Sequence, residues 1–285
     1  MKRLLFQLDT DSYASVFDTV VGFDGGADHV IGHGGCTPEN VRPLVEGAIF
    51  TRAPKEKKNT ALFIGGSDMS AGEALFLAVQ KVFFADFRVS VMLDSNGSNT
   101  TAAAGVAKLL ASGAVSGKQA VVLAGTGPVG RRAAVMLNRE GASVTLTSRD
   151  LGRARQACRD IKERFGVDIH PVQARSHDDR AAALEGAQIV FAAGKAGVEL
   201  LKEEHWKDNR SIEMMADANA TPPLGIGGAD MMDRGKDRHG KILWGAIGFG
   251  SLKLSLHRAC IARLFESNNL LLDAEQIFAL AKSMA

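Results

Sequence analysis

Residues 118–130 read Lys118-Gln119-Ala120-Val121-Val122-Leu123-Ala124-Gly125-Thr126-Gly127-Pro128-Val129-Gly130. A short apolar run of strand length comes first, G-x-G-x-x-G follows, and residues 131–140 have a helical pattern. Gly141 closes this helix, and a second β-rich run begins at Ser143. The order of strand, glycine turn, helix and strand predicts a Rossmann unit that binds a dinucleotide.

The three glycines of this turn have separate tasks. The first permits the tight turn, the second lets a pyrophosphate approach the backbone, and the third lets helix and strand pack closely. The helix start offers unpaired N–H groups and the positive end of its dipole to the phosphates. An ordinary glycine-rich turn shares these six letters, so the flanking elements carry the prediction. We expect the cofactor to be bound by Gly125, Thr126, Gly127, Pro128, Val129 and Gly130.

The end of the second strand indicates which nucleotide is bound. An NAD site usually has an acidic residue there for the ribose 2′-hydroxyl, but this chain reads Thr147-Ser148-Arg149-Asp150. A guanidinium stays charged and can pair bidentately with a 2′-phosphate. Ser148, Arg149 and, one turn on, Arg153 therefore favour NADP over NAD. Asp150 is either a displaced ribose acid or the N-cap of the next helix, and we favour the cap.

Two later loops are expected to complete the cofactor side. Residues 188–193 have the composition of a buried strand and end in a glycine-containing loop, so we expect Ala193, Gly194 and Gly197 beside the cofactor. A further strand, 211–216, ends in the nearly uncharged loop 217–228, which is rich in Pro and Gly. This loop is expected to cover the nicotinamide end of the site.

Composition excludes several classes of protein. The chain has 285 residues, 46% of them apolar and 23% charged, and its net charge is only +2. Interspersed charges indicate neither nucleic acid nor a membrane surface as a partner. No apolar run reaches about 18 residues, and since Met1-Lys2-Arg3 leads straight into a strand-like run we expect no signal peptide. Three distant cysteines indicate neither a zinc site nor a disulfide framework, and we expect no metal. A cytoplasmic, reduced enzyme is expected.

Strands and helices also alternate before the Rossmann stretch, which predicts an α/β fold with two domains. We expect a parallel α/β substrate domain at 1–112, completed by helices of 252–285, and a Rossmann NADP-binding domain at 113–251. The active-site cleft is expected between them. Local patterns predict a helix at 14–21 that buries Val16, Phe17, Val20 and Val21, a strand at 48–50, and a helix from Leu252 to Phe265.

The polar run 94–101 follows a predicted strand at 87–93 and leads into a helix rich in small residues. Ligands of open α/β sheets bind beyond the carboxyl ends of strands, which is where this run lies. Helix capping and a turn would account for one or two of its side chains. Because the run has more polar side chains than a cap needs, we expect a substrate-lining role for Asp94, Ser95, Asn96, Ser98, Asn99 and Thr100.

Four segments resemble a known family. They are 17–18 with 22–29, 92–105, 124–130, and 252–254 with 256–262. Together they resemble the NADP-dependent methylene-tetrahydromethanopterin/methylene-tetrahydrofolate dehydrogenase of methylotrophic bacteria, over nearly the whole chain. The resemblance implies a cytoplasmic homo-oligomer of one-carbon metabolism that oxidises a methylene carrier to the methenyl form with NADP. The sister enzyme that also takes NAD is less similar, because its counterpart of the 94–101 run is different.

The implied chemistry is a hydride transfer. Hydride leaves a methylene carbon that bridges two nitrogens, so the product is a delocalised cation and no base is required. The protein must hold donor and acceptor about 3–3.5 Å apart and tolerate positive charge. The candidate side chains are Asp18, Asp24, Asp28, Asp94, Asp217 and Asn219. For most of them a cap or turn role is the competing interpretation.

Lys253 is the candidate cation of the site, together with Asp18 and Asp94 as candidate catalytic carboxylates. The predicted helix begins at Leu252, where the helix dipole disfavours lysine, so this position requires a reason. We expect Lys253 to face the pterin or the nicotinamide as a donor or positioning group, and His257 to be structural.

Two other functions remain open. A non-catalytic NADP-binding sensor would need no polar run aligned with the nicotinamide. A dehydrogenase of a shikimate-type hydroxy acid would need a proton-transfer pair, which Lys253 with Asp94 or Asp217 could supply. A short-chain dehydrogenase is excluded, since Tyr13, the only tyrosine, has Phe17 and not Lys four residues later.

Overall fold

The computed structural model describes all 285 residues, which form two compact units. The N-terminal unit comprises residues 1–100 and 254–280, and the Rossmann unit comprises residues 101–253 and 281–285. Each unit is built on one sheet. The α4 helix (Ser98–Ser112) begins in the first unit and continues in the second.

The N-terminal unit contains a five-stranded sheet in the order β12-β4-β3-β1-β2, and every pair in it is parallel. Its strands are β1 (Leu4–Asp9), β2 (His29–His33), β3 (Thr60–Gly65), β4 (Ser90–Leu93) and β12 (Leu271–Leu272). Its helices are α1 (Val16–Asp24), α2 (Arg42–Phe50), α3 (Met69–Val82), most of α8 (Ala246–Leu264) and most of α9 (Ala274–Met284), with 3₁₀ turns at Pro54–Asn59 and Ser95–Gly97.

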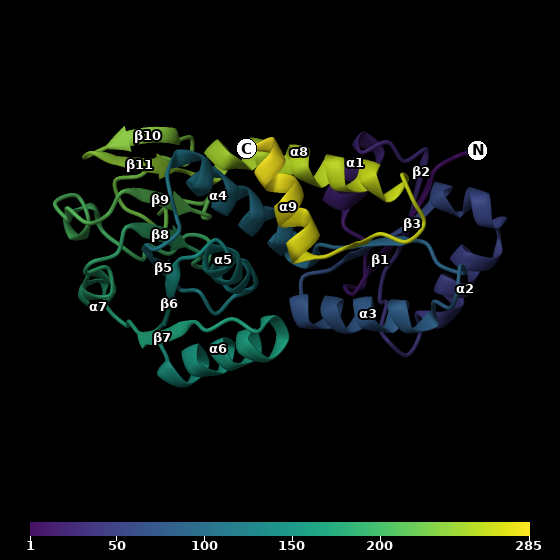
Figure 1. Cartoon of the computed structure of the whole chain (residues 1–285), viewed down its shortest axis with the longest axis horizontal. Coiled ribbons are helices and arrows are strands. Elements are labelled where there is room, and N and C mark those ends of the chain that lie inside the picture. Colours follow the sequence, from purple (N-terminus) through teal and green to yellow (C-terminus); the bar gives the residue numbers. More distant parts are fainter. The chain divides into compact units, whose positions relative to one another are not determined.

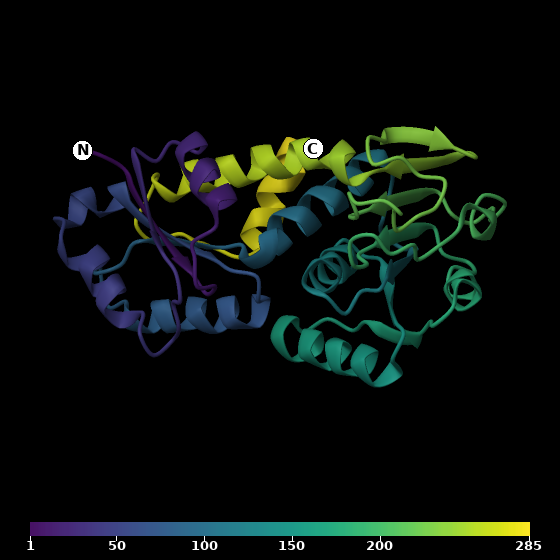
Figure 2. The ribbon, with the colours of Figure 1, turned by 180° about the vertical axis from the view of Figure 1, so that it is seen from behind.

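Helices cover both faces of this sheet. α3 lies along one face, and α1 and α8 lie on the other, where they are neighbours in both ribbon views (Figures 1 and 2). Asp24 at the end of α1 pairs with Arg258 of α8 at 2.6 Å. The fold class predicted for this half, a parallel α/β sheet, is confirmed.

The core of the N-terminal unit lies between the sheet and helices α2 and α3. It includes Val45 and Ile49 of α2, Leu75 of α3 and Val91 of β4, all fully buried. The strand predicted at 48–50 is wrong, because these residues form the last turn of α2. A run of three apolar residues has too few positions to distinguish a period of 2 from one of 3.6.

The apolar side of α1 differs from the expectation. Val16, Phe17 and Val20 were expected to be buried, yet their side chains are 78%, 52% and 52% exposed. Val21 was also expected to be buried and is, and together with Gly22 it makes the face of α1 that packs on the sheet. A Cβ at Gly22 would contact Val30 of β2 at 2.9 Å, so glycine lets the helix approach the strand closely.

The Rossmann unit contains a seven-stranded sheet in the order β10-β11-β9-β8-β5-β6-β7. Only the β10–β11 pair is antiparallel. Its strands are β5 (Gln119–Leu123), β6 (Ser143–Ser148), β7 (His170–Gln173), β8 (Ile189–Ala192), β9 (Met214–Asp217), β10 (Arg234–Arg238) and β11 (Lys241–Trp244). Its other helices are α5 (Pro128–Arg139), α6 (Leu151–Phe165), α7 (His177–Ala182) and a 3₁₀ turn at Glu203–His205.

The predicted strand, glycine turn, helix and strand are confirmed as β5, α5 and β6. In Figure 1, α5 and α6 lie next to each other beside strands β5 and β6. Trp206 is fully buried in an apolar core of this unit that consists of Leu, Val, Ile, Ala and Met side chains. Its indole Nε1 donates to the carbonyl of Gly227 at 2.8 Å, which ties the 217–228 loop to this core.

Helix α8 begins earlier than the sequence pattern predicts. The helix begins at Ala246 and not at Leu252, so Lys253 lies well inside it. A Cβ at Gly248 would overlap the carbonyl oxygen of Asp233, so glycine is required where the segment before β10 crosses the helix. Gly245 and Gly248 therefore serve close packing, whereas a Cβ at Gly250 would meet nothing within 4 Å. Because the helix begins before Lys253, the dipole argument for this lysine is wrong.

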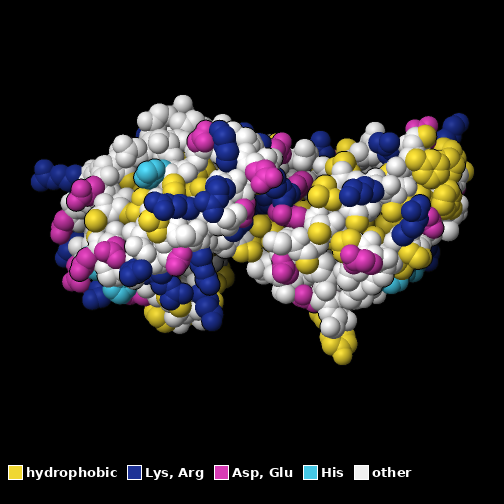
Figure 3. Space-filling model, turned by 90° about the horizontal axis from the view of Figure 1, so that it is seen from below, with side chains coloured by type: hydrophobic (Ala, Val, Ile, Leu, Met, Phe, Trp, Pro, Cys, Tyr) yellow, Lys and Arg dark blue, Asp and Glu magenta, His cyan; other side chains and the backbone are white.

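The surface carries mixed charges. On the face in Figure 3, Lys and Arg side chains alternate with Asp and Glu, and no broad area of one sign appears. None of the helices has both the length and the apolar character that crossing a membrane requires.

Candidate cofactor and substrate sites

The glycine turn is held in place by the end of β6. Ala124 has a left-handed φ of 51°, and its N–H donates to Thr147 Oγ1 at 3.1 Å. The N–H of Gly125 donates to the carbonyl oxygen of Thr147 at 3.0 Å. These two bonds fix the chain reversal that carries β5 into α5.

The surroundings of the three glycines match the tasks predicted for them. A Cβ at Gly125 would lie 2.7 Å from Leu146, and one at Gly130 would lie 2.6 Å from the Cα of Gly125. Both contacts are too close for any side chain. A Cβ at Gly127, in contrast, would meet nothing within 4 Å. The middle glycine therefore faces open space, as a position approached by a ligand must.

The first turn of α5 is also suited to an anion. Gly127 is its N-cap and provides no side-chain cap, and Pro128 occupies the first helical turn. The remaining N–H groups of this turn keep their partial positive charge. The residues present thus fit a dinucleotide whose pyrophosphate would lie at this helix start.

The end of β6 resolves the two interpretations of Asp150. Its Oδ1 accepts a hydrogen bond from the backbone N–H of Arg153 at 2.8 Å, so it is the N-cap of α6 as predicted. The backbone N–H of Asp150 donates in turn to Ser148 Oγ at 3.3 Å. Arg149 and Arg153 are both exposed, and their guanidinium groups have no hydrogen-bond acceptor in the chain.

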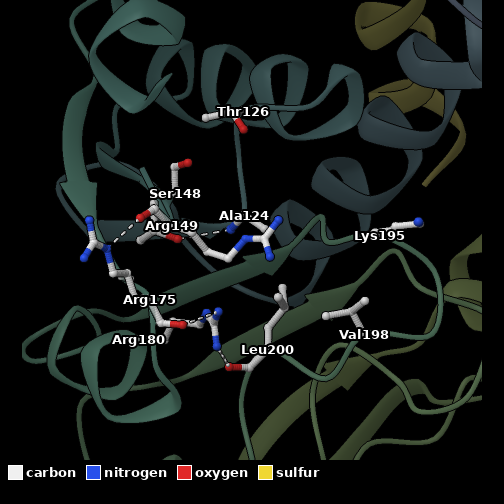
Figure 4. A pocket seen from close by; sticks show the side chains of 11 residues that line it. Ala124, Thr126, Ser148, Arg149, Arg175, Arg180, Lys195, Val198 and Leu200 are labelled. Atoms are coloured by element: carbon white, nitrogen blue, oxygen red, sulfur yellow. Dashed lines mark hydrogen bonds between the residues drawn. The ribbon is translucent and has the colours of Figure 1, made fainter. Parts of the chain in front are cut away.

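A cavity of 490 Å³ lies next to the glycine turn. Figure 4 shows Ser148 and Arg149 on one side of it and Leu200 with Arg180 on the other, while Thr126 marks the side of the turn. A second cavity of 450 Å³ is lined by Arg149, Asp150, Arg153 and Arg175. Of the predicted cofactor residues, Thr126, Ser148, Arg149 and Arg153 line these cavities, whereas the other five residues of the glycine turn do not, and their role remains a prediction.

The loop after β8 contributes differently from the prediction. Lys195 and Val198 line the first cavity, whereas Ala193, Gly194 and Gly197 do not. A Cβ at Gly194 would lie 2.8 Å from Leu200, so this glycine lets the loop fold against a residue of the cavity wall. The role of the loop beside a cofactor remains a prediction.

Two arginines of the cavities were missed by sequence reasoning. Arg175 follows β7, and Arg180 lies in α7. β7 pairs with β6 so that Gln173 lies opposite Ser148, which brings the segment after β7 to Arg149. For Arg175 the sequence did offer a signal, a basic residue just after the end of a strand. The same pattern identified Arg149.

The polar run after β4 turns inward. Asp94, Ser95, Ser98, Asn99 and Thr100 are all buried. Asp94 Oδ1 accepts from the backbone N–H of Asn99 at 2.9 Å and of Thr100 at 3.0 Å, and its Oδ2 accepts from Thr100 Oγ1 at 2.6 Å. These bonds cap α4, and the substrate-lining role of the run remains a prediction. Asn96, at a left-handed φ of 55°, is its exposed polar side chain.

The remaining N-terminal carboxylates lie in different surroundings. Asp18 is half-buried in the first turn of α1, where its N–H donates to Ser15 Oγ, and a Cβ at Gly65 would lie 3.5 Å from its Oδ2. Asp24 is engaged by Arg258. Asp28 accepts from the backbone N–H of Arg3 at 2.6 Å. Asp18 therefore lies closest to the carboxyl end of a central strand, β3.

Asp217 and Asn219 organise the loop after β9. The buried carboxylate of Asp217 accepts from the N–H groups of Asn219 and Ile226. Burial raises the pKa of Asp217, and these backbone donors oppose the rise. Asn219 donates to the carbonyl of Pro223 at 3.0 Å and accepts from the N–H of Thr221. Both side chains have structural bonds, and their substrate roles remain predictions.

Lys253 and His257 both lie within α8. Lys253 is half-buried. His257 is fully buried, stacks on Phe63 with 5.3 Å between ring centroids, and has its Nδ1 4.0 Å from Asp94 Oδ2. No group of three or more His, Cys, Asp or Glu side chains is arranged to hold a metal ion.

Comparisons with known proteins find relatives over the whole chain. The family described as methylene-tetrahydromethanopterin dehydrogenase, N-terminal, matches residues 16–96. A bifunctional protein MdtA of Methylorubrum extorquens is 57% identical over 286 residues, which is 100% of this chain and 99% of that protein. An NAD(P)-dependent methylenetetrahydromethanopterin dehydrogenase of the same organism is 30% identical over 298 residues, again 100% and 99%.

A solved structure supports the fold. A shikimate 5-dehydrogenase of Mycobacterium fortuitum has a TM-score of 0.54 at 15% identity, and the match covers 98% of this chain and 97% of that one. At this identity the likeness concerns the two-sheet α/β fold alone. The full-length similarity to MdtA identifies the family, and the resemblance noted in the sequence is confirmed. The chain therefore belongs to the methylene-tetrahydromethanopterin dehydrogenase family and is an oxidoreductase of one-carbon metabolism.

Proposed function

We propose that this protein transfers a hydride from the methylene carbon of methylene-tetrahydromethanopterin, and of methylene-tetrahydrofolate, to NADP. The methenyl form of the carrier is the product. The observation that carries the choice of NADP is the end of β6. Its one acidic residue, Asp150, is occupied as the cap of α6, while Arg149 extends along the cavity beside the turn (Figure 4). The NAD(P)-dependent relative supports a nicotinamide cofactor of either kind.

Each of the two units is proposed to bind one of the two substrates. The Rossmann unit would hold the cofactor at Gly125–Gly130, and the N-terminal unit, with the predicted bounds 1–112 and 252–285, would hold the pterin. When bound, NADP supplies the hydride acceptor at its nicotinamide ring. The residues of the chain have to position the carrier, exclude water and stabilise the positive charge of the methenyl product.

The surroundings of the three candidate catalytic residues favour a different role for each of them. Asp18 is half-buried near the end of β3, so its carboxylate is the best placed to offset the developing cation. Asp94 is fully buried and capped into α4, which favours an indirect role in holding the helix start. Lys253 would position the carrier as a hydrogen-bond donor from the interior of α8.

The exposed apolar side of α1 supports the expected homo-oligomer. Phe17 and Val20 are each 52% exposed and are joined by Val16 on the same helix. Adjoining exposed apolar side chains often mark contacts with another protein surface. Light scattering after size exclusion measures the number of subunits, and a monomer of 30.2 kDa would contradict this expectation. A cytoplasmic location is part of the same proposal.

The decisive experiment measures NADPH formation by absorbance. Purified protein is given methylene-tetrahydromethanopterin, methylene-tetrahydrofolate or shikimate, each with NADP and with NAD. Turnover of a methylene carrier with NADP is expected, and shikimate should give none. Lys253→Ala should lower kcat/KM for the carrier. Arg149→Ala should raise the KM for NADP by about 10- to 100-fold, because the substitution removes a charge-assisted pair. The KM for NAD should stay nearly unchanged.

The outcomes separate the three functions. Tight NADP binding without turnover of any carrier would favour a sensor. Turnover of shikimate alone would favour the hydroxy-acid dehydrogenase. Arg155→Ala is the matched control for Arg149→Ala, since Arg155 is an exposed arginine of α6 that lines neither cavity. If this control shifts the KM for NADP as strongly, general charge and not a specific pair sets the preference.

A further inference from the structure

Positive charge is concentrated around the two cavities of the Rossmann unit. Together they are lined by five cations and by a single carboxylate, that of Asp150. The cations are Arg149, Arg153, Arg175, Arg180 and Lys195. Since Asp150 already caps α6, it neutralises this group only in part. Like charges held this close repel each other, so the arrangement favours binding of a polyanion.

Arg149 and Arg175 are the two residues that line both cavities. The first cavity begins at the glycine turn, with Ala124 and Thr126, and ends against Val198 and Leu200. Because Arg149 and Arg175 line both cavities, an anionic group of a nucleotide bound where the cavities meet would face residues of the segments after β6 and after β7.

The Arg175 backbone is fixed from both sides. Its N–H donates to Asp179 Oδ2 at 2.7 Å, and its carbonyl oxygen accepts from Arg180 Nη2 at 3.1 Å. Its side-chain Nε donates to the carbonyl oxygen of Arg149 at 3.2 Å. Both terminal nitrogens remain without an acceptor in the chain. Arg131 of the same unit differs, because its guanidinium pairs with Asp160 at 2.8 Å.

Arg180 connects two loops of the cavity. It is only 7% exposed, and its two terminal nitrogens donate to the carbonyl oxygens of Leu200 and Arg175, each at 3.1 Å. Burial and, secondarily, the charge of Arg149 lower the pKa of Arg180. A buried cation with only carbonyl partners fixes the segment after β7 against the segment after β8.

We propose that Arg175 is a second specificity-determining residue for the 2′-phosphate of adenosine, opposite Arg149, and that Arg180 is the positioning residue that holds the Arg175 segment at the cavity. This inference rests on the proposed function, because it assumes that the cofactor is NADP. It adds Arg175 and Arg180, which lie outside the G-x-G-x-x-G turn, to the residues that favour NADP over NAD.

Calorimetry with adenosine 2′,5′-bisphosphate and with adenosine 5′-monophosphate tests this without any pterin. Wild type should bind the bisphosphate more tightly. Arg175→Ala should weaken bisphosphate binding by about 10- to 100-fold, the range of a charge-assisted pair, and change monophosphate binding little. Arg155→Ala should leave both affinities unchanged. If Arg175→Ala keeps the wild-type ratio of affinities, the role of Arg175 is overturned.

Arg180 is tested through its coupling to Arg175. Arg180→Met should lower the ratio of the two affinities, and it should have little further effect in an Arg175→Ala background. A merely structural role would instead weaken both ligands equally in both backgrounds, and this result would overturn the positioning role. If Arg180→Met fails to fold, Arg180→Lys replaces it, because lysine keeps the charge but has only one nitrogen to donate from. Arg180→Lys should lower the ratio of the two affinities less than Arg180→Met, and again should have little further effect in the Arg175→Ala background.

The same titrations separate failure of the inference from failure of the proposed function. Wild type that binds both nucleotides equally would overturn the choice of NADP itself, and the inference with it. Wild type that discriminates and loses discrimination in Arg149→Ala, but not in Arg175→Ala, would retain NADP and overturn the inference alone. Loss in both variants supports both.

Discussion

The β4–α4 and β6–α6 corners occupy the same kind of place in their sheets, yet they treat polar side chains in opposite ways. Each lies where a parallel strand ends and a helix begins. At the first corner, Asp94, Asn99 and Thr100 are buried and bonded to each other. At the second, Arg149 and Arg153 are exposed and have no acceptor. A polar run past a strand can therefore be used to cap the next helix, or it can leave charged groups open to a ligand.

The largest expected effect concerns Asp94. Asp94→Ala removes three hydrogen bonds at a buried helix start, so the free energy of unfolding should fall by about 3 kcal/mol. Urea denaturation measures it. Asp150→Ala is the matched control, because this exposed cap has one such bond, and its loss should be about 1 kcal/mol. If Asp94→Ala keeps wild-type stability but loses turnover, the β4–α4 corner does not use Asp94 for the fold. Asp94 would then belong to the substrate site.

The glycine turn gives the next effect. Gly130→Ala forces a Cβ within 2.6 Å of the Gly125 backbone, which should lower the free energy of unfolding by about 2 kcal/mol despite the better helix propensity of alanine. Gly127→Ala meets open space, so its stability should stay within about 0.5 kcal/mol of wild type. Its NADP affinity should nevertheless fall, by about tenfold. Unchanged NADP affinity in Gly127→Ala would move the pyrophosphate away from this turn.

A smaller effect is expected at Arg153. Its guanidinium is exposed and lines only the second cavity, so Arg153→Ala should weaken NADP binding by about fivefold, or about 1 kcal/mol, with no loss of stability. Calorimetry and urea denaturation measure the two quantities. A clear loss of stability would show that the β6–α6 corner, like the β4–α4 corner, uses its polar residues for the fold.

The smallest effect is a dependence on pH at Asp217. Because burial raises its pKa above 3.8 in the folded state, the stability that its proton contributes is fully present below pH 3.8. That contribution is lost as the pH rises through the folded-state pKa. Asparagine does not titrate, so the unfolding free energy of Asp217→Asn should lack this loss. As the pH rises from 3.8 through the folded-state pKa of Asp217, the unfolding free energy of the variant should therefore increase relative to that of wild type, and above that pKa the difference should stay constant. Urea denaturation at a series of pH values measures the difference, with exposed Asp208→Asn as control.

Local patterns predicted the Rossmann half better than the N-terminal half. The strand, glycine turn and helix at 118–140 are right because a tight turn and close packing each require glycine at a fixed spacing. The short run 48–50 was assigned to the wrong element because three residues define no period. In helix α1 only Val21 of the four residues expected on the buried face is buried, because apolar residues surround the helix and only packing against Val30 selects the face.

The sequence by itself determined the nucleotide turn, the cap at Asp150, the basic residue at the end of β6 and the family. Each of these depends on residue types within one turn or on similarity over the whole chain. Only the tertiary structure decided that Arg175 and Arg180 join Arg149, and that Asp94 and its neighbours face inward. The register of β7 on β6 and the burial of the α4 start result from packing between distant segments, which no local pattern encodes.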